Sequence, residues 1–363
     1  MGGTPSNIFL YGKTGTGKTA VAQSVSNSLI SKGRDSNIQL IKSYINCNLT
    51  NTNYRVLWQL CKNIGINVPD TGLPTDAVYS KFREGLDSSD QLLVIILDEV
   101  DKLVNRSGND VLYDLTRMKV DLQQARVCLI GITNDLKFKE QLDPRVLSSL
   151  SEEELFFAPY KATELKTILS QRAEMAFRPG VYEEGVINLC AAIAASEHGD
   201  ARHALHLLRV SGEFAEREEL NIVTEKLVKQ ARKRIELDKV GEFIKDLPIQ
   251  SKTVLHCIYL LEINGKKDIF SGDVYNVYSE ICGIVDLDRL TQRRISDFIN
   301  ELIMHGIIDA QEISRGRYGR TRRIQLSVPK EQVRIVLEED EDTTSRLKQV
   351  IDYVPDLIRL QVS

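Results

Sequence analysis

The sequence predicts an α/β domain with a parallel sheet, then an all-helical unit, and last a unit of helices followed by a short hairpin. Short apolar runs alternate with amphipathic stretches over residues 7–157, which is typical of a parallel sheet covered by helices on both faces. Strand-like runs are absent from about 161 to 237. After residue 246, helical spacing gives way to two alternating segments. These observations indicate at least three folding units.

Length and composition are consistent with this organisation. A chain of 363 residues is long for one hydrophobic core, so two or three domains are expected. We predict domains at 1–160, 161–238 and 239–330, and a C-terminal part at 331–363 that contains the acidic run "EEDED".

Charge and cysteine usage narrow the class of protein. The net charge is -4, so any contact with a polyanion must come from a local basic patch. Six cysteines are scattered without a C-x-x-C pair, which indicates reduced interior residues and no disulfide framework or zinc site. No apolar run approaches the length of a membrane span. We therefore expect a cytoplasmic protein with no membrane partner.

The first domain consists of alternating strands and helices. The expected strands are "NIFLY", "IQLIKSYINC", "LLVIIL", "RVCLIGI" and "ELFFAPY". The expected helices cover 18–32, 53–64, 75–86 and 109–122. Pro74 and Thr75 stand where the third of these helices is expected to begin.

A phosphate-binding loop joins the first strand to the first helix. "GKTGTGKT" (12–19) fits the pattern G-x-x-x-x-G-K-[ST], and it has the flanking strand and helix that this motif requires. We expect ATP or ADP to bind here, with Lys18 reaching the β-phosphate and, in ATP, the γ-phosphate, and with Thr19 holding Mg²⁺. The candidate nucleotide-binding residues of this segment are Gly12, Thr14, Gly15, Thr16, Gly17, Lys18, Thr19 and Ala20.

Polar side chains follow two further buried strands. Asp98 and Glu99 end "LLVIILDE", and Asn134 follows "VCLIGIT". Ligands of open α/β sheets bind at the carboxyl ends of the strands. Asp98 is therefore a candidate metal ligand, while Glu99 is a candidate to polarise the attacking water. Asn134 is a candidate to orient that water, and a simple strand-end turn is its alternative role.

These motifs resemble those of the AAA+ ATPases, and more narrowly those of the archaeal initiators in the origin recognition and helicase-loader family. The resemblance lies in "PSNIFLYGKTGTGKT", "LDEVD", "GITND", "LDPRVLSSL", "FAPY" and "GDARHALHLLR". It implies an α/β P-loop AAA+ domain, an α-helical lid and a C-terminal winged-helix domain. It also adds Tyr160 of "FAPY" to the nucleotide-binding candidates.

The resemblance assigns roles to four basic residues. Arg202 of "GDAR" matches the lid arginine that contacts the γ-phosphate, and an ordinary helix-surface arginine is the alternative. Arg145 of "DPRVLSSL" matches the arginine that acts on a neighbouring subunit's nucleotide, although it could instead brace the sheet. Lys102 and Arg106 lie where the initiators carry a DNA-contacting helical insertion, and a solvated helix face is equally compatible with them.

The region 246–330 is expected to form the winged helix. Ser271 is the predicted N-cap of its second helix. "DRLTQRRISDFINELIMHGII" (288–308) is predicted to be the recognition helix, with Arg293 and Arg294 near its start. Its predicted apolar face consists of Leu290, Ile295, Phe298, Ile299, Leu302 and Ile303.

A strongly basic loop is expected between the two strands of the hairpin. The expected loop is "RGRYGRT" (315–321), between the strands "GIIDAQEIS" and "RRIQLSV", and the stretch "RGRYGRTRR" (315–323) contains five arginines and no acid. The predicted DNA contacts here are Arg315, Arg317, Tyr318, Arg320 and Arg322. Arginines on such a tip can pair with phosphates or enter a narrow minor groove. An acidic protein partner, or a solubilising hairpin without a partner, are the alternatives.

With the resemblance, these features predict an ATP-regulated replication initiator that associates with the nucleoid. The resemblance implies that it binds double-stranded origin DNA, helps to load the replicative helicase, and acts with a paralogous initiator or with itself on DNA. ATP hydrolysis is expected to be slow and to serve as a switch. The alternatives are a winged-helix regulator of transcription or plasmids, and a clamp-loader-like remodelling ATPase.

Overall fold

The computed structural model describes residues 5–35, 38–150, 152–314, 320–339 and 347–355. The chain divides into two compact units, Met1–Val228 and Lys229–Ser363, and each is described by itself. Within the described residues, no helix is long and apolar enough to cross a membrane.

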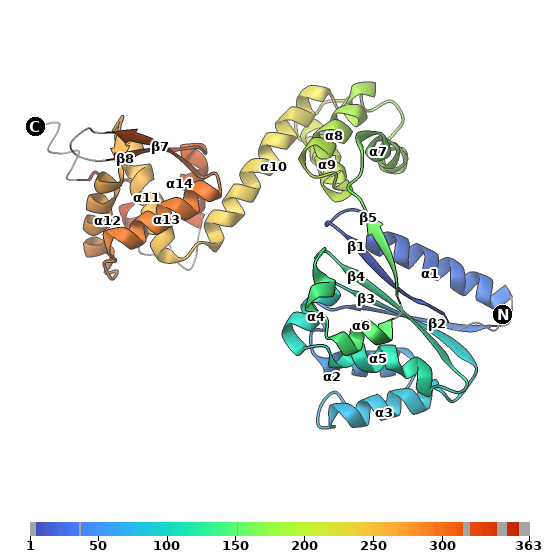
Figure 1. The fold of residues 1–363 in the computed structure, drawn as a ribbon. Helices are drawn as coiled ribbons and strands as arrows, with labels where there is room; N and C mark the ends of the chain where they lie inside the picture. Colours follow the sequence, from blue (N-terminus) through green and yellow to red (C-terminus); the bar gives the residue numbers. More distant parts are fainter. Residues whose placement is uncertain (1–4, 36–37, 151, 315–319, 340–346, 356–363) are drawn as a thin grey trace, which may run out of the picture. The chain divides into compact units, whose positions relative to one another are not determined.

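A five-stranded parallel sheet forms the centre of the first unit (Figure 1). Its strands are β1 (Asn7–Gly12), β2 (Gln39–Asn46), β3 (Gln91–Asp98), β4 (Arg126–Thr133) and β5 (Glu152–Phe157). The strand order is β2-β3-β4-β1-β5, so β1, with the phosphate-binding loop at its end, lies between β4 and β5. The five predicted strands are therefore confirmed.

Helices cover both faces of this sheet, but unequally. Figure 1 shows α1 (Lys18–Asp35) alone on one face, over a small cluster that includes Leu10, Ile96 and Ile130. The main core lies on the opposite face. It is closed by α2 (Asn53–Asn63), α3 (Thr75–Leu86), α4 (Val100–Ser107), α5 (Asp110–Asp121) and α6 (Pro144–Leu150), with the 3-10 turn η1 (Phe138–Gln141).

The helical lid follows β5. It consists of α7 (Ala162–Ala176), α8 (Glu184–Glu197) and α9 (Ala201–Arg217), which pack through Leu165, Cys190 and Leu207. Asp200 caps α9, because its carboxylate accepts hydrogen bonds from the N–H groups of Arg202 and His203. The last helix of this region, α10 (Glu225–Asp246), runs from the first unit into the second.

The second unit has the predicted winged-helix arrangement. Its helices are α11 (Ile249–Ile263), α12 (Ser271–Val285), α13 (Gln292–Met304) and α14 (Lys330–Glu339), followed by the 3-10 turn η3 (Lys348–Val350). A three-stranded antiparallel sheet, in the order β6-β8-β7, packs beside them. Its strands are β6 (Ile269–Phe270), β7 (Ile308–Ser314) and β8 (Arg320–Leu326). The core joins Ile258, Tyr278 and Ile299 to Val333 and Leu347.

Three local predictions in this unit are wrong. Ser271 is the first residue of α12 and not its cap, because Asp273 already accepts the backbone N–H of Phe270 across this helix start. Leu290 precedes α13, which begins at Gln292, although it packs against the core. Arg320 is the first residue of β8 and not part of the connecting loop.

The second unit buries a histidine that makes its stability depend on pH. His256 of α11 is 0% exposed, and neither ring nitrogen has a hydrogen-bond partner among the described residues. Burial lowers the pKa of His256 to about 4, and this effect outweighs the backbone of Ile351 and the negative charge of Asp352, which both raise the pKa. The folded state therefore favours the neutral imidazole, whereas the unfolded chain takes up a proton near its ordinary pKa of about 6.5.

We expect the second unit to lose stability as the pH falls from about 6.5 towards 4. The loss from His256 is about 1.4 kcal/mol per pH unit, because only the unfolded chain binds the proton in this range. Urea unfolding of the wild type and of His256→Leu, measured from pH 7.5 to 5, checks this. The variant should lose less stability than the wild type over the same range, and equal losses would contradict the assignment.

Candidate functional site

The loop between β1 and α1 has the backbone geometry of a phosphate cradle. Gly15 and Gly17 have φ angles of 71° and 87°, a region that residues with a Cβ rarely adopt. The loop ends where α1 begins at Lys18, so the positive end of the helix dipole faces it. Thr16 is buried, and its hydroxyl donates to the carbonyl of Lys13 at 2.9 Å. Thr14 and Ala20 are exposed on either side.

Lys18 is held at the carboxyl edge of the sheet. Its ammonium donates to the carbonyls of Gly12 and Lys13, at 2.7 Å each, and to Oδ1 of Asn134 at 2.9 Å. Burial lowers the pKa of Lys18, while the nearby Asp98 carboxylate opposes this shift. The structure thus brings Lys18 and Asn134 together, although 116 positions separate them in the sequence.

Asp98 and Thr19 form an oxygen pair next to the loop. The hydroxyl of Thr19 donates to Oδ2 of Asp98 at 2.8 Å, and Asp98 is only 7% exposed. A carboxylate and a hydroxyl oxygen are the kind of donors that Mg²⁺ prefers. The two residues therefore fit the predicted metal site.

Glu99 leaves the sheet in a strained conformation. Its φ and ψ of 55° and 46° place it in the left-handed region, which costs a residue with a side chain about 1–2 kcal/mol. Its N–H lies 3.1 Å from Oδ1 of Asp98. This turn ends β3 directly before α4 begins at Val100 and keeps Glu99 partly exposed beside Asp98.

The lid contacts the phosphate-binding loop directly. The N–H of Ala201, at the start of α9, donates to the carbonyl of Gly15 at 3.2 Å. A Cβ on Gly15 would overlap the carboxylate of Asp200, and one on Gly17 would press on the hydroxyl of Tyr160. Arg202, in the first turn of α9, is close enough to lower the pKa of Lys18, although this effect is smaller than those of burial and Asp98. Tyr160 and Arg202 therefore lie beside the loop.

Arg145 lies on the surface at the first turn of α6. Its guanidinium is 2.9 Å from Oδ2 of Asp143, and its Nε donates to Oδ1 of the same carboxylate at 3.1 Å. The Cζ atom of Arg145 also lies 5.5 Å from the ring centre of Tyr113 on α5. The exposed guanidinium of Arg145 is thus oriented by contacts with Asp143 and Tyr113 of the same chain. Lys102 and Arg106 are exposed on α4.

The predicted DNA-binding residues of the second unit are placed only in part. Arg293 and Arg294 are exposed in the first turn of α13, where Arg294 pairs with Asp297 at 3.6 Å and lies over the ring of Phe298. Arg322 donates to the side chain of Asn300 on α13. Arg315, Arg317 and Tyr318 lie outside the described residues, and of Arg320 only the backbone is described.

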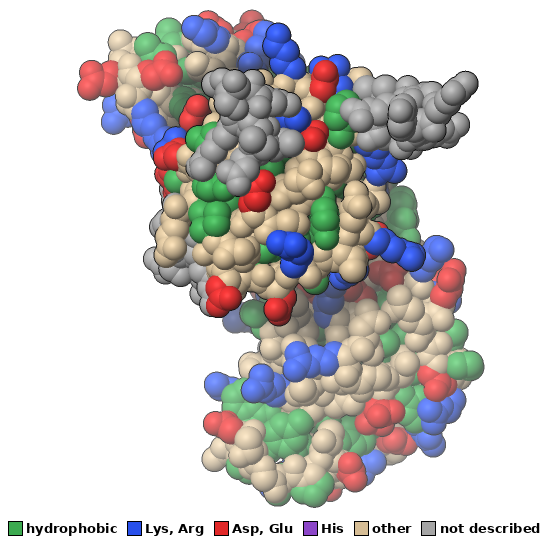
Figure 2. All heavy atoms as spheres, turned by 90° about the vertical axis from the view of Figure 1, so that its left-hand side faces the viewer, with side chains coloured by type: hydrophobic (Ala, Val, Ile, Leu, Met, Phe, Trp, Pro, Cys, Tyr) green, Lys and Arg blue, Asp and Glu red, His purple; other side chains and the backbone are tan. Residues whose placement is uncertain are grey.

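Basic and acidic side chains are mixed on one face of the second unit. Figure 2 shows Lys and Arg side chains interspersed with Asp and Glu on the face that it presents, without one continuous patch. Arg323, for example, lies 2.9 Å from Asp268. Among the described residues, Arg293 has no acidic partner within 4 Å, so its charge is available to an external anion.

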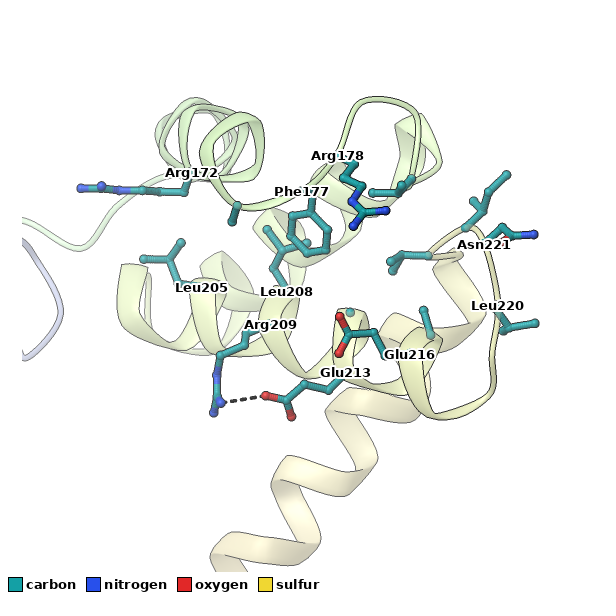
Figure 3. Close-up of a pocket in the computed structure, with 16 residues that line it drawn as sticks. Arg172, Phe177, Arg178, Leu205, Leu208, Arg209, Glu213, Glu216, Leu220 and Asn221 are labelled. Carbon is teal, nitrogen blue, oxygen red and sulfur yellow. Dashed lines mark hydrogen bonds and ion pairs between the residues drawn. The ribbon is translucent and has the colours of Figure 1, made fainter.

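A separate pocket of about 770 Å³ lies in the lid (Figure 3). Phe177, Leu208 and Leu220 line it, and an ion pair of 2.8 Å between Arg209 and Glu213 stands at its edge. None of the residues that line it belongs to the phosphate-binding loop. The candidate nucleotide site is therefore defined by the loop geometry and not by this pocket.

Tyr44 is a site residue that the sequence motifs did not reveal. It lies on β2, and its hydroxyl donates to Oδ2 of Asp98 at 2.8 Å. No motif in the sequence marks this contact. It results from the pairing of β2 with β3, in a register that sets Tyr44 opposite Ile96 and Asn46 opposite Asp98. Only this register brings Tyr44 to the carboxylate.

Comparison with known proteins matches each part of the chain to a described family. The matching models are an "AAA domain" (2–138), a "Cdc6 AAA+ ATPase-type lid domain" (166–233) and a "CDC6, C terminal winged helix domain" (242–335). The ORC1-type DNA replication protein of Pyrococcus abyssi is 56% identical over 343 residues, which cover 93% of this chain and 82% of that protein. The chain belongs to the family of ORC1-type DNA replication proteins.

A second relative and a solved structure support the same family assignment. ORC1-type DNA replication protein 1 of Methanosarcina mazei is 52% identical over 354 residues, which cover 97% of this chain and 84% of that protein. The solved structure of the Aeropyrum pernix ORC1 protein, in complex with DNA, has 43% identity and a TM-score of 0.72, and covers 96% of this chain and 89% of that one. The archaeal initiator resemblance and the predicted AAA+, lid and winged-helix fold are therefore confirmed.

Proposed function

We propose that this ORC1-type replication protein is an ATP-regulated initiator that binds double-stranded origin DNA and helps to load the replicative helicase. The observation that carries this proposal is the direct contact between the phosphate-binding loop and the lid, through Gly15 and Ala201. It links a nucleotide site to the helical lid in a chain that also carries a winged helix. The proposal includes the predicted domain limits, which are 1–160 for the AAA+ domain, 161–238 for the lid, 239–330 for the winged helix and 331–363 for the C-terminal part.

ATP or ADP would be bound by the loop and by Lys18. The backbone of residues 12–20 would enclose the phosphates, and the Lys18 ammonium would exchange carbonyl partners for phosphate oxygens. Mg²⁺ would be held by Thr19 and Asp98, and when bound it would neutralise charge on the β- and γ-phosphates. Glu99 would accept a proton from the attacking water, which Asn134 would orient.

Nucleotide would act as a switch through the lid. Arg202 and Tyr160 stand beside the loop, so a bound γ-phosphate would give Arg202 a bidentate anionic partner. A ligand shifts a conformational equilibrium only by its difference in affinity for the two states. Arg202 supplies that difference, since ATP and ADP differ in the phosphate that it would contact. Hydrolysis would be slow, and Arg145 of a neighbouring initiator subunit would accelerate it.

DNA would be bound mainly by the winged helix. The Aeropyrum pernix ORC1 structure is a complex with DNA, and this supports the same activity here. Arg293 and Arg294 at the start of α13, with Arg322 and the arginines of the hairpin loop, would contact phosphates and base edges. Lys102 and Arg106 of α4 would add phosphate contacts from the AAA+ domain. Such binding would place the protein on the nucleoid.

Footprinting on origin DNA, with and without the cognate helicase, tests this function. We expect protection of origin duplex that depends on ATP, and recruitment of the helicase only to the protected DNA. Promoter protection without helicase recruitment would instead support a transcription or plasmid regulator. Vigorous ATP turnover by a ring without DNA would support a remodelling motor.

A further inference from the structure

Tyr44 supplies a hydrogen bond to the carboxylate at the centre of the candidate metal site. The phenol and the hydroxyl of Thr19 both donate to the same oxygen, Oδ2 of Asp98, at 2.8 Å each. The other oxygen, Oδ1, faces the N–H of Glu99 at 3.1 Å. Both carboxylate oxygens are thus fixed, and the carboxylate plane has a defined orientation.

The phenol is suited to this task because it stays protonated. A phenol ordinarily ionises only at about pH 10, so at neutral pH Tyr44 is a neutral donor that adds no charge beside the metal site. Its ring packs against the cluster under α1, so β2 holds the phenol in place independently of the phosphate-binding loop.

We propose that Tyr44 is a positioning residue for Asp98 in the binding of magnesium-bound nucleotide, an inference that rests on the proposed function. Thr19 belongs to the loop that would enclose the phosphates, and a metal ion would engage its oxygen. Tyr44 belongs to β2, outside that loop, so its bond to Oδ2 does not depend on a residue that encloses the phosphates. Partners of this kind, which orient a metal ligand from behind, typically contribute 10–100-fold to metal affinity.

The test is a magnesium titration of nucleotide binding by Tyr44→Phe in the full chain. Fluorescent ATP is the probe, with binding measured in EDTA and at increasing Mg²⁺ concentrations. We expect affinity in EDTA within about twofold of the wild type, and an Mg²⁺ requirement raised by about tenfold. The matched control is Tyr79→Phe, which removes a phenol hydroxyl bonded to the carbonyl of Asp114 on the other face of the sheet.

The outcomes separate this inference from the function on which it rests. An unchanged Mg²⁺ requirement in Tyr44→Phe would overturn the positioning role and leave the nucleotide site intact. An equal loss with and without Mg²⁺ would mean that Tyr44 supports the fold, and would overturn it too. A folded wild type that binds no ATP in either condition would overturn the proposed function, and the positioning role with it.

Discussion

Replacing Lys18 with alanine is expected to weaken ATP binding at least about 100-fold. Lys18 is the buried cation of the phosphate-binding loop, and its ammonium is held by three oxygen acceptors at the sheet edge. Charge-assisted bonds to phosphate are among the strongest that a side chain makes, and alanine supplies none. Isothermal titration of ATP into the full chain, with and without Mg²⁺, measures the loss.

Control measurements must distinguish a lost ligand from a lost fold. The second unit of the Lys18→Ala chain should still bind duplex DNA at low salt, because the winged helix has its own core, and only the ATP-dependent part of origin binding should be lost. The Lys18→Arg variant keeps the positive charge but not the shape of the ammonium group, and it should bind ATP more tightly than the Lys18→Ala variant. Loss of ATP binding, DNA binding and thermal stability together would show that the substitution unfolded the protein. ATP binding close to that of the wild type would contradict the site.

Replacing both Arg293 and Arg294 with alanine is expected to weaken duplex DNA binding on the order of tenfold or more, and to flatten its salt dependence. Each phosphate contact contributes about 0.9 to the slope of log affinity against log salt, so two lost contacts reduce the slope by about 2. Fluorescence anisotropy with a labelled duplex, from low to physiological salt, gives both quantities. From the sequence, we expect the same behaviour for Arg317 and Arg320.

A matched pair of surface arginines controls for the change in net charge. Arg209→Ala with Arg234→Ala also removes two exposed arginines, each of which pairs with an acid one helical turn away. This control should leave the salt slope within error of the wild type. If the control flattens the slope as much as the α13 pair does, the DNA contacts attributed to α13 are wrong.

The sequence predicted the strands and the phosphate-binding loop because their signals are local. Apolar runs marked all five strands of the sheet, and "GKTGTGKT" marked the loop. The proximity of Lys18 and Asn134 also followed from the sequence, since the carboxyl ends of parallel strands meet at one edge. A family resemblance was needed to place Arg202 and Tyr160, which have no local pattern of their own.

Contacts that depend on register or on domain docking could not be predicted. Tyr44 reaches Asp98 only because β2 pairs with β3 in one register, and a shift by one residue would turn it to the other face. The overlap that a Cβ on Gly15 would make with Asp200 comes from the lid's position on the loop. Strand β6 has two residues, too few to show an alternating pattern.

The central claim is that a nucleotide-responsive loop and lid direct a winged helix to the DNA where replication begins. A genome-wide map of the sites bound by this chain, compared with the positions where replication bubbles open, tests it most directly. The account predicts that the strongest bound sites coincide with bubble positions and that Lys18→Ala reduces their occupancy. Bound sites that lie at promoters away from every bubble, with occupancy unchanged in Lys18→Ala, would contradict it.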